Sequence, residues 1–170
     1  QLHNPWGLAL SGDDQLYVCD YWNYRVQVFG LDGSHVRSWG SCGEEEGEFC
    51  RPSGLTVDEE CVYVCDENND RVQVFGLDGT FLRMWGSRGA GDGEFNSPSD
   101  VMVQGELLYV SDSGNNRVQV FEKETGTFVR SWGSAGARPG QFQSPCGMAL
   151  SDDGQLWVCD FSNQRMQLFE

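Results

Sequence analysis

The sequence has little positive charge. Of its 170 residues, 11 are Lys or Arg and 26 are Asp or Glu, which gives a formal net charge of −15. A chain with this balance repels nucleic acids and anionic lipid surfaces unless its basic residues cluster. Most of them are instead dispersed over two positions of an internal repeat: Arg25, Arg71, Arg117 and Arg165 at one position, and Arg37, Arg83 and Arg130 at the other. We therefore do not expect a nucleic-acid partner.

Long hydrophobic runs are also missing. No apolar stretch approaches the roughly 20 residues that a membrane-spanning helix needs. The start, Gln1–Pro5, has neither the basic nor the apolar segment of a secretory leader. It lacks an initiator Met, and the last repeat stops unfinished at Phe169–Glu170. These features predict a soluble piece of a longer protein with no membrane partner and a cytoplasmic location, an extracellular one being the alternative.

The sequence offers few metal ligands. It has two histidines, His3 near a terminus and His35 before an expected outer strand, whereas a catalytic zinc needs about three protein ligands. Its seven cysteines include no Cys-x-x-Cys pair. The sequence therefore predicts no catalytic residue, no metal and no cofactor.

The cysteines themselves have two interpretations. Cys19, Cys65 and Cys159 share one repeat position, which favours a small buried side chain. Cys42 and Cys50 flank an acidic loop and could form a disulfide. The odd total favours reduced thiols.

The sequence does contain a fourfold repeat. Its frame is Asp-x-x-Asn-x-Arg followed by apolar-Gln-apolar-Phe. The copies begin at Asp20, Asp66, Asp112 and Asp160, separated by 46, 46 and 48 residues. A period in the forties with short strands is typical of propeller blades or solenoids.

The first three repeats are each predicted to form four short strands, and the fourth is predicted to form three. In the first repeat these are Gly7–Leu10, Leu16–Cys19, Arg25–Phe29 and Val36–Trp39. A sheet that is apolar on both faces needs a neighbouring sheet on each side, as a propeller blade has. We predict an all-β β-propeller of four-stranded antiparallel blades, about fifteen strands in all. The blades are 5–51, 52–97, 98–144 and 145–170, the last with three strands; Phe49, Phe95 and Phe142 are expected to fill the gaps between them.

The second repeat carries the pattern of a known family. Pro52–Asp58 (Pro-x-Gly-Leu-x-Val-Asp), Tyr63–Asp66 (Tyr-Val-Cys-Asp) and Asn69–Phe75 (Asn-x-Arg-Val-Gln-Val-Phe) resemble the NHL repeat, and the resemblance extends over essentially the whole chain. It implies a propeller of typically six blades, of which this chain is an incomplete arc. It also implies two kinds of function: the substrate- or RNA-recruiting propeller of a tripartite-motif ubiquitin ligase, or a zinc-dependent lyase acting on peptidyl hydroxyglycine.

The repeated Asp residues could form a ligand ring, but a feature present in every blade is more often architectural. We expect the Asp that opens the turn to accept backbone N–H bonds, the Asn to adopt the left-handed conformation, and the Arg to pair with an acidic neighbour. Catalysis then remains an alternative in one form only, a propeller lyase or hydrolase whose metal ligands lie in blades outside this chain.

The turn between the second and third strands is the least symmetric part of the repeat. It is Tyr21–Tyr24 in the first copy and Ser113–Asn116, small and polar, in the third. Exposed Tyr and Trp often anchor protein interfaces. We predict a non-enzymatic scaffold that binds a protein or peptide on one face: Tyr21, Trp22, Tyr24, Glu44, Glu45, Glu46, Glu48, Glu67, Asn68 and Phe161. The alternative is that the aromatic residues cover a seam between blades.

Two further expectations follow from the same pattern. The run Glu44–Glu48 lacks the alternating ligands of a calcium loop, so we interpret it as a solvated acidic segment that attracts a basic partner. An arc also has two open ends, and unpaired sheet edges there predict self-association.

Overall fold

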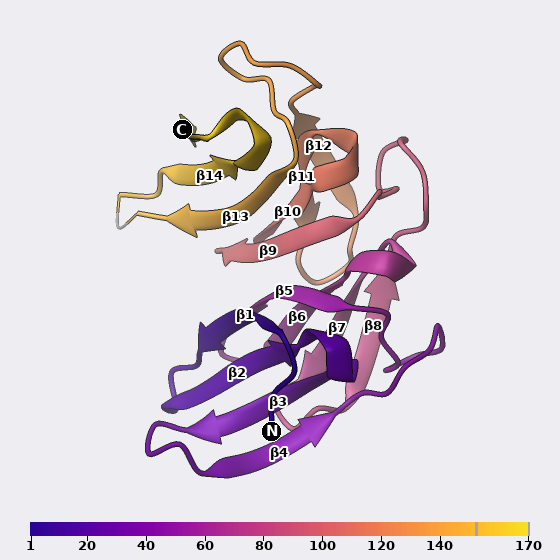
Figure 1. Ribbon diagram of the computed structural model, residues 1–170, viewed down its shortest axis with the longest axis vertical. Coiled ribbons are helices and arrows are strands. Elements are labelled where there is room, and N and C mark those ends of the chain that lie inside the picture. The colour runs from indigo at the N-terminus through magenta and orange to yellow at the C-terminus, as the bar shows by residue number, and fades with distance from the viewer. Residues whose placement is uncertain (152, 170) are drawn as a thin grey trace.

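The computed structural model describes residues 1–151 and 153–169, and within them fifteen strands form four antiparallel sheets (Figure 1). Blade 1 contains β1 (Pro5–Leu10), β2 (Gln15–Asp20), β3 (Arg25–Gly30) and β4 (His35–Trp39). Blade 2 contains β5 (Pro52–Val57), β6 (Cys61–Asp66), β7 (Arg71–Gly76) and β8 (Phe81–Trp85). Blade 3 contains β9 (Pro98–Gln104), β10 (Leu107–Asp112), β11 (Arg117–Glu122) and β12 (Phe128–Trp132), and blade 4 contains β13 (Pro145–Leu150), β14 (Leu156–Asp160) and β15 (Arg165–Phe169). The predicted all-β propeller architecture is confirmed.

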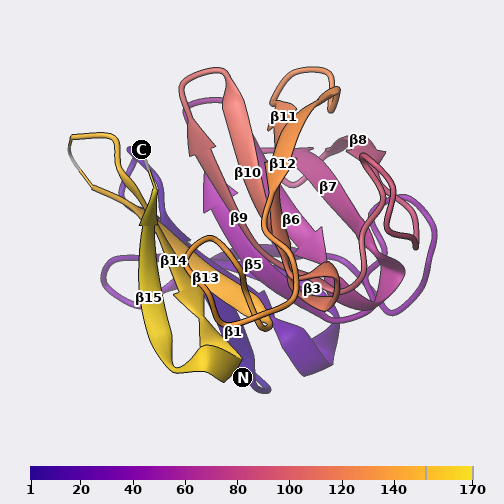
Figure 2. The ribbon, with the colours of Figure 1, turned by 90° about the horizontal axis from the view of Figure 1, so that it is seen from above.

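Each sheet is a meander whose strands pair in chain order. The first strands β1, β5, β9 and β13 contact one another in succession, so the blades follow around an arc that has blades 1 and 4 at its ends (Figure 2). Short 3₁₀ turns join the second and third strands: η1 (Tyr21–Asn23), η2 (Glu67–Asn69), η3 (Ser113–Asn115) and η4 (Phe161–Asn163). These turns and the long connections between blades share one side of the arc, where they are hydrogen bonded to each other. We call this side the turn face.

Three hydrophobic clusters fill the seams between neighbouring blades. Between blades 1 and 2, Tyr17 and Val26 pack with Val62 and Phe75, and none of these is more than 1% exposed. Equivalent residues fill the other two seams. One aromatic residue from each connection is fully buried in its seam, as predicted: Phe49, Phe95 and Phe142. Burying one such side chain contributes about 2–3 kcal/mol.

The repeated Asp is the centre of a buried hydrogen-bond network. In blade 2, Asp66 Oδ2 accepts hydrogen bonds from Asn69 Nδ2 (2.8 Å), Arg71 Nε (2.8 Å) and Gln73 Nε2 (3.1 Å). Its Oδ1 accepts the backbone N–H of Cys50 at 2.7 Å. The same four donors surround Asp20, Asp112 and Asp160. With its lone pairs occupied in this way, each carboxylate supports the architecture instead of forming part of an open ligand ring.

The Arg of the motif extends this network into the preceding connection. Arg71 Nη1 donates to the Glu44 carbonyl (2.6 Å), and Nη2 donates to the carbonyls of Glu45 (2.9 Å) and Glu48 (2.8 Å). Arg117 and Arg165 make the equivalent three bonds in their blades. Each long connection is therefore held by the blade that follows it.

The predicted role of the Asn was wrong, whereas each repeated Asp does accept a backbone N–H group, as predicted. The left-handed residue is the one after the Asn: Tyr24, Asp70, Asn116 or Gln164, with φ of 51–56°. The 3₁₀ turn ends on the Asn, so the reversal comes one position later, and the Asn amide instead donates to the carboxylate and to a carbonyl of the connection. The N–H group that the Asp accepts also belongs to the connection, because none of the four Asp side chains caps its own 3₁₀ turn.

All seven cysteines are free thiols, including Cys42 and Cys50. Cys42 pairs with Phe49 in an isolated β-bridge, while Cys50 donates its N–H to Asp66. Burial raises the pKa of the Cys19 and Cys65 thiols well above 9, so both are neutral and pack as small apolar groups.

One carboxyl group interrupts the symmetry of the inner strands. Asp100 in β9 stands where the other blades have Gly7, Gly54 and Gly147. Its Oδ2 accepts the N–H of Met148 from blade 4 at 2.7 Å. Burial raises the pKa of the Asp100 carboxyl to about 6. The hydrogen bonds from the Met148 and Val101 N–H groups lower the pKa and offset only part of this shift.

We predict that Asp66→Ala destabilises the protein more than Asp20→Ala. Asp66 pairs with an Arg71 side chain that is only 8% exposed, whereas the Arg25 side chain beside Asp20 is 31% exposed. Removing one partner of a buried ion pair costs about 3–5 kcal/mol, and an exposed arginine is rehydrated at lower cost. Urea unfolding followed by circular dichroism measures both variants. Equal losses of stability in the two variants would contradict the expectation that the more deeply buried Asp66–Arg71 pair matters more for stability than the Asp20–Arg25 pair.

We also predict that Asp100→Asn stabilises the protein at pH 8 and has a much smaller effect at pH 4. The folded-state pKa is about 6 and the ordinary value is 3.8, so folding favours the protonated acid. The contribution of Asp100 is therefore lost as pH rises from about 4 to about 6, by on the order of 3 kcal/mol. The amide does not titrate and keeps an oxygen for the Met148 N–H. A difference between variant and wild type that is the same at both pH values would contradict this prediction.

Candidate protein-binding face

The turn face carries a cluster of aromatic side chains at the seam between blades 1 and 2. Tyr21 and Trp22 of η1 lie edge to face, with ring centroids 5.3 Å apart. Trp6 of β1 lies 5.9 Å from Tyr21, and the guanidinium carbon of Arg51 lies 4.8 Å from the Trp22 centroid. Trp6 is 59% exposed and Trp22 is 38% exposed. We call Trp6, Tyr21, Trp22, Arg51 and Glu67 the aromatic platform.

Arg51 fixes the platform from the connection between the blades. It has φ of 66°, a left-handed conformation that turns the chain sharply before β5. Its backbone carbonyl accepts the N–H of Glu67 at 3.2 Å, which joins the end of the connection to η2. A cation over an indole face at this distance contributes about 0.5–1 kcal/mol at an exposed site. The connection between blades 1 and 2 thus supplies the charge that lies over the Trp22 ring of blade 1.

Glu67 and Tyr21 form the half-buried side of the platform. The Tyr21 hydroxyl donates to the Glu67 carboxylate. Burial raises the pKa of the Glu67 carboxyl, and the Tyr21 hydrogen bond and the Arg51 charge oppose this shift. Burial and the Glu67 charge also raise the pKa of Tyr21. The tyrosine therefore stays neutral and acts as the donor to the Glu67 carboxylate.

The predicted acidic residues divide into two groups. Glu44, Glu45 and Glu46 are exposed at the tip of the connection, where the carbonyls of Glu44 and Glu45 are fixed by Arg71. Glu48 instead turns inward and its Oε2 accepts the Glu45 N–H at 3.2 Å. Glu94 and Gln141 do the same in the next two connections. Glu48 therefore stabilises the loop, and three acidic side chains remain free to face a partner.

The other predicted residues lie in different surroundings. Tyr24 packs against the hydrophobic cluster of the seam between blades 1 and 2. Asn68 is exposed on η2, next to the platform residue Glu67. Phe161 is 67% exposed on η4, which belongs to blade 4 at the opposite end of the arc. The structure thus brings together Tyr21, Trp22, Glu67 and Asn68 and leaves Phe161 apart from them.

Sequence reasoning missed Trp6 and Arg51. Trp6 occupies the repeat position held by Ser53, Ser99 and Cys146, so the test of asymmetry that selected Trp22 also selects it. The contact of Arg51 with Trp22 depends on how the connection approaches η1, which no local pattern in the sequence indicates.

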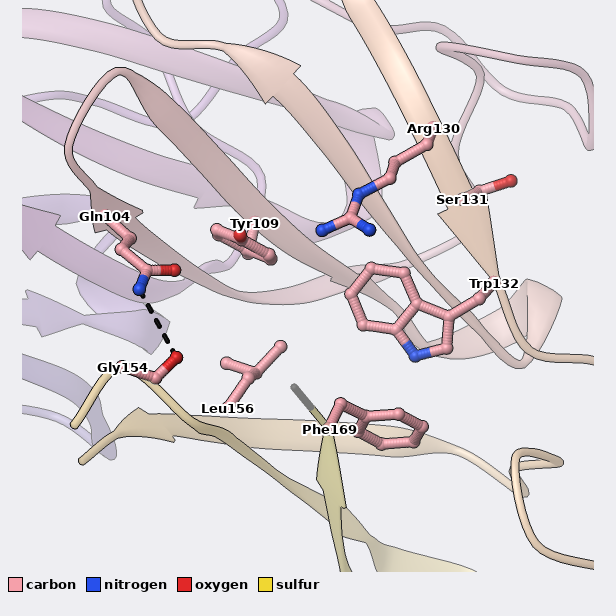
Figure 3. A pocket seen from close by; sticks show the side chains of 8 residues that line it. All are labelled: Gln104, Tyr109, Arg130, Ser131, Trp132, Gly154, Leu156 and Phe169. Carbon is pink, nitrogen blue, oxygen red and sulfur yellow. Dashed lines mark hydrogen bonds between the residues drawn. The ribbon is translucent and has the colours of Figure 1, made fainter.

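A separate hollow of about 240 Å³ lies on the side of the seam between blades 3 and 4 (Figure 3). Arg130 lies over the Trp132 ring on one wall, and Gln104 donates to the Gly154 carbonyl on another. In the seam between blades 2 and 3, the equivalent arginine, Arg83, instead donates to the Lys123 carbonyl. The volume is below the roughly 300–1,000 Å³ of typical small-molecule sites. The hollow therefore lies where the Arg130 side chain packs on Trp132 and does not donate to a backbone carbonyl as Arg83 does.

The two histidines cannot share a metal ion. His3 lies beside Trp22 on the turn face, while His35 packs on Phe29 at the opposite end of blade 1. Among residues 1–151 and 153–169, no group of three or more His, Cys, Asp or Glu side chains is arranged to hold a metal. Within the same residues, no helix is long and apolar enough to cross a membrane.

Several solved structures share this fold at low sequence identity. The nidogen/laminin complex aligns with a TM-score of 0.78 and 19% identity over 100% of this chain and 60% of the other. Kuenenia stuttgartiensis hydrazine synthase aligns with a TM-score of 0.70 and 16% identity, over 100% of this chain and 50% of the other. Virginiamycin B lyase from Staphylococcus aureus aligns with a TM-score of 0.66 and 14% identity, over 96% of this chain and 54% of the other. The chain thus spans about half to three fifths of each, and the likeness concerns the fold alone, since these proteins include both enzymes and a binding complex.

The comparison with family models is more specific. The NHL repeat matches residues 2–29, 49–75, 95–121 and 142–169, which is more than half of the chain. Three of the matches start at a seam residue (Phe49, Phe95 or Phe142), and all four end at the Phe that closes the repeat frame, two residues after the repeated Gln. These are the positions that carry the seams and the buried Asp network. The chain belongs to the NHL-repeat family of β-propellers.

Proposed function

We propose that this propeller is a non-enzymatic scaffold that binds a protein or peptide on its turn face, with the aromatic platform as the anchor. The observation that supports this best is the exposure of Trp6 and Trp22 at repeat positions where sister blades carry small or polar residues. The fold does not require large aromatic side chains there. Rigid, half-exposed Trp and Tyr rings next to an Arg are the composition typical of binding hot spots.

The charge on the turn face suggests the chemistry of the partner. The connection that ends in Arg51 carries Glu44, Glu45 and Glu46 exposed at its tip. The whole chain has a net charge of −15. We therefore propose a partner segment that combines Lys or Arg residues, attracted by the acidic tip, with an apolar or aromatic side chain that packs on the exposed indoles.

The resemblance to tripartite-motif proteins suggests one form of this role, recruitment of a substrate to a ubiquitin ligase, whose catalytic parts would belong to other domains of the protein. The lyase alternative is supported by the likeness of fold, while the described residues bring together no group of three or more His, Cys, Asp or Glu side chains that could hold a metal ion. Turnover of a peptidyl hydroxyglycine substrate by this chain would favour the enzyme over the scaffold.

We predict that Trp22→Ser weakens peptide binding by about 2 kcal/mol, roughly 30-fold in Kd. Ser is the residue of blade 4 at this position, so the 3₁₀ turn accommodates it. Peptides selected from a displayed library on the wild-type protein supply the ligand, and calorimetry measures Kd. Phe161→Ser is the matched control, since it removes an exposed aromatic residue from the equivalent turn of blade 4.

The stability of the same variants separates the two interpretations of the aromatic residues. A binding anchor predicts a thermal midpoint close to that of wild type for Trp22→Ser. A variant that binds normally but melts at clearly lower temperature would identify Trp22 as seam packing and overturn the site. Equal loss of binding in Phe161→Ser would move the anchor away from the platform.

We further predict that the triple variant Glu44→Gln, Glu45→Gln, Glu46→Gln slows association with a basic peptide and leaves dissociation nearly unchanged. Charges at the rim of an interface act mainly on the association rate, and their effect fades as salt screens them. Surface plasmon resonance at low and high salt measures both rates. An association rate that does not depend on these residues or on salt would contradict the electrostatic part of the proposal.

A further inference from the structure

The turn face carries a larger hollow on blade 2, an interior blade, with a volume of about 510 Å³. Its lining residues come from η2, from the end of β8 and from two connections, the one that leads into β5 and the one that leaves β8. This volume falls within the roughly 300–1,000 Å³ of typical ligand sites. We call the hollow the blade-2 notch and define it by these residues: Glu44, Asn68, Arg71, Met84, Trp85 and Arg88.

Four of these side chains are not required by the fold. Arg71 and Trp85 belong to the repeated framework, whereas the other four have smaller counterparts in blade 3, which is built from the same elements. The corresponding residues are Glu44 and Ala90, Asn68 and Gly114, Met84 and Ser131, and Arg88 and Ala135. Since architecture keeps the symmetry of a repeat, this departure from it favours a binding role for the notch.

Opposite charges stand on the two connections of the notch. Glu44 belongs to the connection that leads into β5 and Arg88 to the one that leaves β8, and both side chains are exposed. The ion pairs formed within residues 1–151 and 153–169 do not include Arg88, whereas Arg51 stacks on the aromatic platform. The Arg88 guanidinium is therefore available to an anionic group of a ligand.

The side chains near Arg88 suit a carboxylate on an aliphatic stem. A guanidinium binds a carboxylate through two parallel hydrogen bonds, and the exposed Asn68 amide is a further donor in the notch. Met84 is 40% exposed, and its Sδ accepts Arg71 Nη1 at 3.1 Å, which fixes an apolar wall for methylene groups. Glu44 attracts a cation on its own side, so the notch favours a ligand that carries both charges in a fixed order.

The notch adjoins the aromatic platform. Asn68 of the notch directly follows Glu67 of the platform in η2, and consecutive Cα atoms are about 3.8 Å apart. An extended peptide advances about 3.3 Å per residue. A single segment of a few residues can therefore contact both.

We infer that the blade-2 notch binds the carboxylate of an Asp or Glu side chain in the partner segment, whose apolar anchor lies on the aromatic platform and whose Lys or Arg residues face Glu44. The partner is thus a mixed-charge segment and not a uniformly basic one. This inference rests on the proposed function, because it concerns the same partner on the same face. Contact with Arg88 acts on the dissociation rate, whereas the exposed acidic tip acts mainly on association.

Peptides selected from a displayed library on the wild-type protein test this inference. They are expected to carry Asp or Glu within about five residues of the apolar anchor. Arg88→Glu is expected to raise the Kd of such a peptide at least about 10-fold, mainly through faster dissociation. Ala135→Glu is the matched control, because it places the same charge at the same repeat position of the next connection. Circular dichroism confirms that both variants are folded.

Exchanging the acidic residue of the peptide for Lys separates direct contact with Arg88 from a general effect of charge. The exchanged peptide is expected to bind the wild type more weakly and to recover most of the lost affinity on Arg88→Glu. Selected peptides without enrichment of acidic residues would overturn the inference. So would an Ala135→Glu variant as impaired as Arg88→Glu, or an exchanged peptide that recovers nothing.

Trp22→Ser reports on the platform separately. Loss of affinity in Trp22→Ser but not in Arg88→Glu supports the proposed function and overturns the role of the notch. Loss in Arg88→Glu alone supports the notch and removes the platform as the anchor. A library that yields no peptide for the wild-type protein contradicts both.

Discussion

The structure depends on one buried ion pair that is repeated in every blade, the Asp of the turn with the Arg five residues later. The carboxylate is fully buried in all four copies, and it is held by four donors from three parts of the chain. Replacing a buried pair of this kind with apolar residues often costs little stability. Its value here is specificity, because the same two side chains fix the 3₁₀ turn, the third strand and the incoming connection in one arrangement.

The network is not equally protected along the arc. Burial raises the pKa of Asp66 in blade 2 against the effect of its hydrogen bonds. In the end blades, burial acts in the same direction on Asp20 and Asp160, but the hydrogen bonds outweigh it and lower the pKa. The Arg25 and Arg165 side chains are also more exposed than Arg71. The ion pair is therefore better shielded from solvent in blade 2 than in blades 1 and 4.

The fold could be predicted from the sequence because its determinants are local and repeated four times. Asp20, Asn23 and Arg25 recur with constant spacing, and strand patterns surround each copy. The site could be predicted only in part. Tyr21 and Trp22 stood out against the small residues of blade 3, but the stacking of Arg51 on Trp22 comes from a connection whose path is set by Arg71 and Asp66, far along the chain. Glu48 was predicted to be exposed like Glu44, Glu45 and Glu46, because the sequence does not distinguish it from them. Its side chain instead turns inward and accepts the Glu45 N–H within the loop.

The way each connection is held has a consequence for how the protein can be divided. Phe49, the Cys50 N–H and the carbonyls of Glu44 to Glu48 belong in sequence to the end of blade 1, yet they complete the seam and the buried network of blade 2. A fragment that started at Pro52 would leave the Asp66 and Arg71 side chains without these partners. The segment that contains all of its own partners therefore consists of one connection and the sheet that follows it. An excised or transplanted blade 2 should begin near Gly40 instead of at its first strand.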